Sequence, residues 1–169
     1  PAPSRSPKVK LYLNDKLIGE KETGKENYTA TFDVPYEPGT LKAVNSKGKE
    51  EFVLKTAGAP AAIRLIADRS KIKACKNDLS YVKIELVDKN GNVVPETSLP
   101  VKIECTGKGT VIAGGNAAYA DMESFRSLTP NTFRGKAIAI VQPDGEKGDI
   151  QVKVSAKGLE DASIVITTY

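Results

Sequence analysis

The stretch from Leu79 to Thr106 constrains the fold most strongly, because it holds two runs in which apolar and charged residues alternate. Residues 82–86 read VKIEL and residues 101–105 read VKIEC. A period of two is typical of a strand that buries one face, so Lys83 and Glu85 are expected in solvent. Between the runs, Asn90 and Gly91 predict a tight turn, since both residue types tolerate positive φ. The stretch therefore predicts two adjacent strands of a β-sandwich.

Two domains fit the length better than one. The chain has 169 residues, enough for one sizeable core or two small ones. Short alternating runs between Val9 and Leu54 predict about five strands around a thin core, which we expect to lean on a neighbour. Small apolar residues and a proline at 57–62 indicate a boundary, which places a small immunoglobulin-like sandwich at 1–58 and a second one at 59–169. The predicted fold is all-β, with two immunoglobulin-like β-sandwich modules in tandem.

A long loop interrupts the second module. No alternation is present between Asn116 and Arg134, and a loop of that length in a compact domain is more often a functional or docking segment than a spacer. Regular strands are predicted again at 136–142, 149–156 and 162–168, which together with the earlier runs gives about seven strands.

The predicted strand at 136–142 is apolar on both faces. Ile138 and Ile140 lie on the face opposite Ala137, Ala139 and Val141. Two interpretations remain open: the flanking loop covers the two isoleucines, which we favour, or they face another domain.

Composition excludes several classes of function. The net charge of +4 is divided evenly between the two halves, without the clustered cations that nucleic-acid binding requires. No apolar run reaches the roughly 18 residues of a membrane span, and no leader pattern is found. Histidine is absent, which removes the commonest general base and metal ligand, and the absence of tryptophan weakens a sugar-binding interpretation.

The candidate contact residues lie in the long loop. Asp121 and Glu123 are paired carboxylates of the kind that glycosidases use, beside Tyr119, Phe125 and Arg126. A two-residue spacing in a loop does not ensure the separation of about 5 Å that a retaining glycosidase needs. We therefore favour solvated loop carboxylates, with Tyr119, Phe125 and Arg126 as candidates for a sugar or interdomain contact.

Two further motifs carry weaker signals. Asp88, Asn90 and Asn92 resemble the start of a calcium loop, but the remainder of the twelve-residue pattern is missing and a plain turn is favoured. Gly114, Gly115 and Asn116 would suit an anion cradle, but no helix is expected to follow. We expect no catalytic residue, metal site or cofactor in this chain.

The cysteines allow one disulfide at most. Cys75 precedes the strand that begins near Leu79, and Cys105 ends the next predicted strand, so antiparallel pairing would bring both to the same end of the sandwich. Two unpaired thiols, buried or half-buried, are the favoured alternative.

Several segments resemble a known family. Residues 11–21 (LYLNDKLIGEK) and 32–44 (FDVPYEPGTLKAV) resemble the small immunoglobulin-like domain that follows the catalytic barrel of family 2 glycoside hydrolases of the bacterial β-galactosidase type. The segments 54–74, 87–95 (VDKNGNVVP) and 135–142 (GKAIAIVQ) resemble the C-terminal domain after it, which is similar to invasin-type bacterial repeats. The chain departs from the family at Met122, where relatives carry histidine.

The resemblance implies a non-catalytic accessory region of a β-galactosidase-like enzyme. Its expected partner is the catalytic domain of the same polypeptide or a second subunit, and its expected location is periplasmic or extracellular. Relatives carry a further strand upstream of Val9, which implies a first module truncated at its N-terminus. Alternatives from other classes are a carbohydrate-binding module and an adhesion or stalk module.

Overall fold

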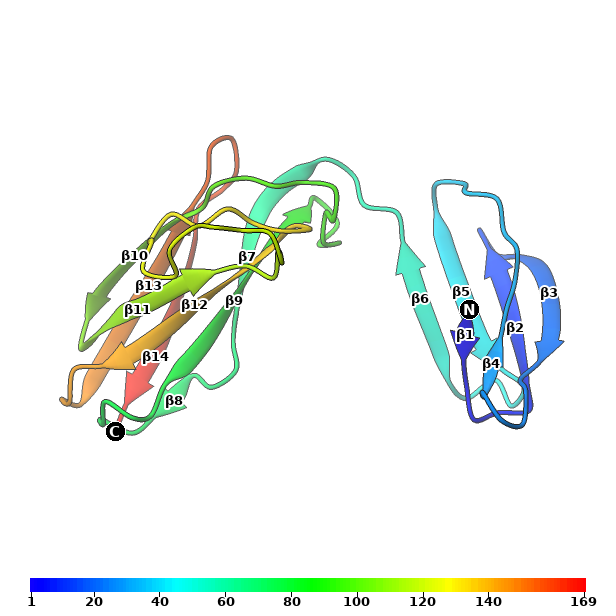
Figure 1. Cartoon of the computed structure of the whole chain (residues 1–169), viewed down its shortest axis with the longest axis horizontal. Helices are drawn as coiled ribbons and strands as arrows, with labels where there is room; N and C mark the ends of the chain where they lie inside the picture. The colour runs from blue at the N-terminus through cyan, green and yellow to red at the C-terminus, as the bar shows by residue number, and fades with distance from the viewer. The chain divides into compact units, whose positions relative to one another are not determined.

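The computed structural model describes residues 1–169 and consists of strands and loops (Figure 1). The all-β prediction is confirmed. The chain separates into two compact units, Pro1–Thr56 and Ala57–Tyr169. No helix long and apolar enough to cross a membrane is present.

The first unit contains one four-stranded sheet and one two-stranded sheet. Strands of the larger sheet are ordered β3-β2-β5-β6, and β1 pairs antiparallel with β4. The bounds are β1 Ala2–Pro3, β2 Lys8–Leu13, β3 Lys16–Glu22, β4 Thr29–Ala30, β5 Thr40–Asn45 and β6 Glu51–Lys55. The alternation in β2 buries Val9, Leu11 and Leu13, which form a small core with Ala30.

One of the alternating runs of the first unit, residues 28–34 (YTATFDV), forms a strand of only two residues, because its partner is short. Only Thr29 and Ala30 pair, since β1 is two residues long and Pro3 has no N–H to donate. Tyr28 enters β4 with φ of 49°, a left-handed conformation that ends regular pairing on that side. Every residue of β6 is exposed, so the core of the first unit is thin.

The second unit is a sandwich of two four-stranded sheets, with the orders β11-β12-β9-β7 and β10-β13-β14-β8. The bounds are β7 Pro60–Ala67, β8 Lys71–Ile72, β9 Ser80–Asp88, β10 Lys102–Gly107, β11 Gly109–Gly115, β12 Lys136–Pro143, β13 Gly148–Ser155 and β14 Ala162–Thr168. All pairings are antiparallel except the short one between β14 and β8. Alternate residues of each strand enter the core between the sheets.

The prediction that residues 82–86 and 101–105 form adjacent strands is wrong. β9 pairs with β7 and β12, whereas β10 pairs with β13, so the two strands belong to opposite sheets. Both still contribute to one core, through Ile84 and Ile103 for example. Alternation shows that a face is buried, but it does not identify the hydrogen-bonded neighbour.

The long loop between β11 and β12 covers the free edge of β10. Ile103 N donates to Leu128 O at 2.8 Å, and Val101 N donates to Pro130 O at 3.0 Å. The loop returns toward β12 at Thr132, whose N donates to Leu99 O at 2.8 Å. Residues 128–132 therefore satisfy backbone groups that an uncovered edge strand would expose.

Candidate functional site

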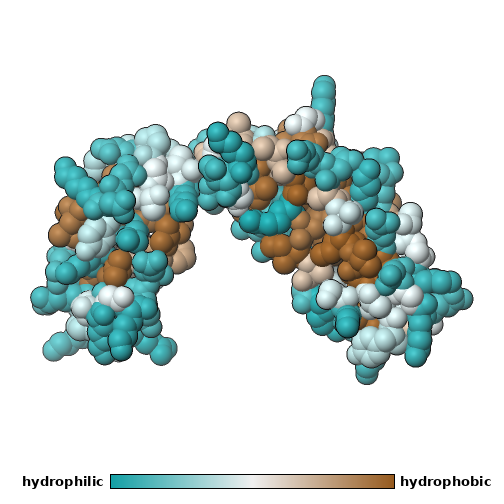
Figure 2. Space-filling view, turned by 180° about the vertical axis from the view of Figure 1, so that it is seen from behind, coloured by the Kyte–Doolittle hydropathy of each residue, from teal (hydrophilic) through white to brown (hydrophobic).

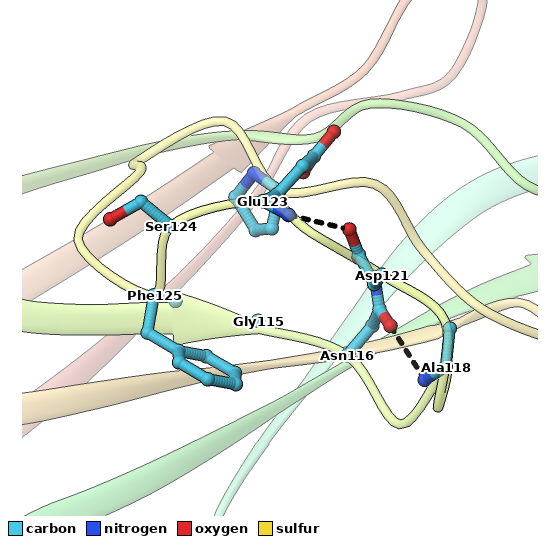
Figure 3. A pocket seen from close by; sticks show the side chains of 9 residues that line it. Gly115, Asn116, Ala118, Asp121, Glu123, Ser124 and Phe125 are labelled. Carbon is cyan, nitrogen blue, oxygen red and sulfur yellow. Dashed lines mark hydrogen bonds between the residues drawn. The ribbon is translucent and has the colours of Figure 1, made fainter.

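A small depression lies between the end of β11 and the long loop (Figure 3). Its volume is about 30 Å³, the volume of one water molecule and about a tenth of the smallest usual ligand pocket. The lining residues are Gly114, Gly115, Asn116, Ala118, Asp121, Glu123, Ser124, Phe125 and Pro130. A depression of this size has no room for a sugar ring.

Asn116 organises the start of the loop. Its Oδ1 accepts a hydrogen bond from Ala118 N at 2.7 Å, which makes a local Asx turn (Figure 3). Its Nδ2 donates to Asp121 Oδ2 at 2.5 Å and to Asn131 O at 2.9 Å. One side chain therefore connects the end of β11 with both sides of the loop.

The carboxylates of the predicted pair also brace the loop. Asp121 Oδ1 accepts from Glu123 N at 2.9 Å (Figure 3), and Glu123 accepts from both the backbone and the side-chain amide of Asn131. The sequence singled out the carboxylates, but it indicated Asn116 only as part of an anion cradle and gave no role to Asn131. Asparagine directly after a strand, with small residues following, was the available signal for the first of them.

The apolar side chains of the same loop face outward. Tyr119 is 99% exposed, and Met122 and Phe125 are also exposed. The Phe125 ring lies against Gly115, where an added Cβ would meet two ring carbons at 2.7 and 2.9 Å. Arg126 is exposed, and its backbone N donates to Ser124 Oγ at 3.2 Å. Polar groups thus hold the loop from within while apolar groups face solvent, which is typical of a contact segment.

Ile138 and Ile140 project from the outer face of β12. Ile138 is 38% exposed and Ile140 is partly buried, so the loop leaves Ile138 open to solvent. The Phe125 ring packs on Gly115, and Gly115 is the cross-strand neighbour of Ile138. The structure therefore places the ring of Phe125, from the loop, over the strand next to that of Ile138 on one sheet face.

Glu85 on the same face is buried, contrary to the prediction that it lies in solvent. It is 3% exposed because Arg64, Lys83 and Lys136 surround it from neighbouring positions. Arg64 donates to Glu85 Oε2 through Nε at 2.9 Å and through a terminal nitrogen at 2.6 Å. Burial by itself raises the pKa of Glu85, but the hydrogen bonds and charges of Arg64 and Lys83 outweigh it and hold the pKa below its usual value.

Glu85→Gln is expected to lower the free energy of unfolding by about 2 kcal/mol, less than for a fully buried pair because the cations reach solvent. The amide keeps the shape but leaves three cations without their counter-charge. Urea denaturation measures the change. Glu104→Gln is the matched control, since Glu104 is exposed and pairs with Lys102 at 2.8 Å on the other sheet. Equal losses in the two variants would contradict this account.

Asp88 fastens the start of the second unit to the turn after β9. Its Oδ2 accepts from Gly58 N at 2.8 Å and from Asn92 Nδ2 at 3.1 Å. Its Oδ1 accepts from Asn90 N and Asn92 N. These donors, led by Gly58, lower the pKa of Asp88 to about 2. The calcium hypothesis required the Asp88 oxygens as ligands, but both of them accept hydrogen bonds from N–H groups.

Asp88 is expected to stabilise the fold above pH 4 and to lose that contribution as the pH falls. Its pKa is about 2 in the folded chain against an ordinary 3.8, so the folded state binds the proton less readily than the unfolded state. The difference in unfolding free energy between wild type and Asp88→Asn should be constant above pH 4 and shrink between pH 4 and pH 2. Denaturation at a series of pH values measures it. A difference that does not change with pH would contradict the assignment.

The disulfide between Cys75 and Cys105 is not formed, and both thiols are free. The geometric basis for that alternative fails because Cys105 lies on β10, in the sheet opposite β9. Cys105 is partly buried and contacts Gly109 O through Sγ at 3.6 Å. Burial raises the pKa of the Cys105 thiol, which keeps it protonated.

Comparison with known families matches both units. Residues 63–165 match the model of the glycoside hydrolase family 2 C-terminal domain 5, and residues 2–52 match a domain of unknown function, DUF4982. The first match covers more than half of the chain.

Individual relatives give the same result. A beta-galactosidase of Bacteroides ovatus is 32% identical over 167 residues, which are 97% of this chain and 20% of that protein. A beta-glucuronidase of Formosa agariphila is 27% identical over 164 residues, covering 94% of this chain and 16% of that protein. A solved glycosyl hydrolase family 2 member from Bacteroides cellulosilyticus superposes with a TM-score of 0.90 at 36% identity, covering 97% of this chain and 22% of the other. The chain thus spans about a fifth of the length of these proteins.

Proposed function

Since the chain belongs to the glycoside hydrolase family 2 C-terminal domain 5 family, we propose that it is the non-catalytic accessory region of a longer β-glycosidase. In this proposal the two units pack on the catalytic domain of the same polypeptide and help to shape its substrate cleft. A second subunit is the alternative partner. The family match carries the proposal, and the loop geometry supports it.

The loop has the construction of a contact segment rather than of a catalytic one. The carboxylates of Asp121 and Glu123 are engaged with amides of the loop, which holds their positions. Tyr119 and Met122 are exposed on that braced frame. A loop backbone held in this way loses little conformational freedom when a partner covers it.

The proposed substrate of the longer enzyme is a β-galactoside or a β-glucuronide. These two activities appear in the names of the similar proteins from Bacteroides ovatus and Formosa agariphila. We place the enzyme in the periplasm or outside the cell, on the family resemblance; cell fractionation with an antibody against this chain tests the location.

The test is the full-length polypeptide from the gene that encodes this chain, compared with a version that lacks residues 57–169. We expect the full-length protein to hydrolyse a p-nitrophenyl β-galactoside or β-glucuronide, and the shortened one to have a lower kcat/KM and a lower thermal midpoint. A gene without a barrel-sized catalytic region, or a full-length protein inactive on both substrates, would overturn the proposal.

Sugar binding by the loop itself is tested with the 169-residue chain. Millimolar galactosides, β-glucans and host glycans are titrated while NMR chemical shifts of the loop are followed. We expect no shift at Tyr119 or Phe125, because the depression that Phe125 lines has a volume of only about 30 Å³, too small for a sugar ring. Saturable shifts there would instead support a carbohydrate-binding module.

A further inference from the structure

We propose that the outer face of the sheet β11-β12-β9-β7 is the surface by which the second unit docks onto the rest of the longer polypeptide. The surface that it meets is apolar at its centre and acidic at its rim. This inference rests on the proposed function and names the contact surface within it.

The centre of the face is apolar across neighbouring strands. Ile66 and Ile138 are both cross-strand partners of Lys83, so the three side chains form one row. Tyr81 and Ile140 are opposite each other in the next row. Three apolar residues on hydrogen-bonded strands of this sheet are each about two-fifths exposed: Ile66, Tyr81 and Ile138. Figure 2, a view of the molecule from behind, shows how hydrophobic (brown) and hydrophilic (teal) residues are distributed over the surface on that side.

The outer face of the opposite sheet has a different composition. Its outward positions are mainly polar or charged: Lys102, Glu104, Gln151, Lys153, Ser163 and Thr167. Val165 is the apolar exception there and is 47% exposed. The two faces belong to one sandwich, so the apolar character of the first is not a general property of this surface.

The long loop extends the apolar face at one side. Phe125 rests on Gly115, and Gly115 is the cross-strand neighbour of Ile138. An exposed aromatic ring therefore continues the row of Ile138 beyond the edge strand β11. Aromatic side chains are enriched in protein interfaces.

Positive charge borders the apolar centre. Arg64, Lys83 and Lys136 surround the single carboxylate of Glu85, which leaves an excess of cations at this rim. Lys83 directs its amine to Glu85 Oε1 at 3.1 Å, so its alkyl chain lies between Ile66 and Ile138. A partner that covers this rim gains most if it supplies carboxylates.

The charge pattern also selects between the rest of the polypeptide and a second copy of this chain. A symmetric dimer through this face would bring the same excess cations of both copies together, at an electrostatic cost. The similar glycosidases, in contrast, hold about four-fifths of their length outside the matched region. A segment of that size has ample surface for an interface of about 800 Å² per partner.

Hydroxyl-radical footprinting tests the inference directly. The oxidation rate of Tyr81 is compared between the 169-residue chain and the full-length polypeptide from the same gene, with exposed Tyr169 as internal control. We expect several-fold slower oxidation of Tyr81 in the full-length protein and an unchanged rate at Tyr169. Ile138→Glu in the full-length protein should restore the oxidation of Tyr81, and Val165→Glu, at a similarly exposed position on the opposite face, should not.

Each other outcome overturns the inference. Equal oxidation of Tyr81 in the two forms would show that this face stays open, and in an active full-length glycosidase it would leave the proposed function intact. Protection of Tyr81 in the 169-residue chain that increases with protein concentration would assign the face to a second copy. Equal effects of Ile138→Glu and Val165→Glu would point to general destabilisation.

Discussion

Ile84→Ala is expected to lower the free energy of unfolding of the second unit by about 4 kcal/mol. Ile84 is fully buried between the two sheets, at the centre of β9, and belongs to the main core cluster. Removing three carbons there loses their transfer free energy and leaves a cavity, since strands that are hydrogen-bonded on both sides cannot collapse into it. For a unit of this size a change of that magnitude approaches the whole stability.

Ile66→Ala is the matched control for that measurement. Ile66 is the same residue type on the neighbouring strand β7, but it points outward and is 40% exposed. Ile66→Ala should lower the free energy of unfolding of the 169-residue chain by less than about 1 kcal/mol, because substitutions at exposed positions rarely have a larger effect. Urea denaturation of both variants gives the comparison. Losses of similar size would mean that the sandwich interior is less well packed than the structure indicates.

Gly135→Ala is expected to cost about 3 kcal/mol. Gly135 has φ of 71°, and an added Cβ would meet Val94 O at 2.3 Å, which is far inside contact distance. The residue cannot shift freely, because its N donates to Thr97 O and its O accepts from Leu86 N. The methyl group would therefore push the segment after β9 away from β12, breaking hydrogen bonds on both sides.

Gly158→Ala is the control that measures the strain of alanine at positive φ without the steric clash that Gly135→Ala causes. Gly158 has φ of 80°, and no atom lies within 4 Å of its Cβ position. Gly158→Ala should lower the free energy of unfolding only by the cost of a left-handed alanine, about 1 kcal/mol. Thermal and urea unfolding of the two variants measure the difference. If both alanines cost the same, the close approach of Val94 to Gly135 does not exist in solution.

The regular strands could be predicted from the sequence, and their partners could not. Alternation at 82–86 correctly identified Val82, Ile84 and Leu86 as core residues. It could not show that β10 belongs to the opposite sheet, because the buried face is the same whichever neighbour a strand has. The length of a strand is also hard to predict, as the short strand at Thr29–Ala30 shows, because an alternating segment pairs only as far as its partner extends.

The side chains that fix the loop and the sheet face were harder to predict. Glu85 looked like a solvent residue, because its three cations come from β7, from β9 itself and from β12, and only the register brings them together. Asn116 and Asn131 are 15 residues apart, so their contact depends on the closed loop. The exposed Tyr119 and Phe125, in contrast, were identified from the sequence as contact candidates, and that role stays a prediction.

The cover over the edge of β10 limits how the long loop can change. Residues 128–132 act as an extra backbone partner for that edge, while Tyr119 and Met122 lie on the part of the loop that pairs with no strand. Residues 128–132 therefore cannot move away without uncovering a strand edge that invites aggregation. Substitutions of the exposed Tyr119 and Met122 can therefore fit the loop to a different neighbour while the edge of β10 stays covered.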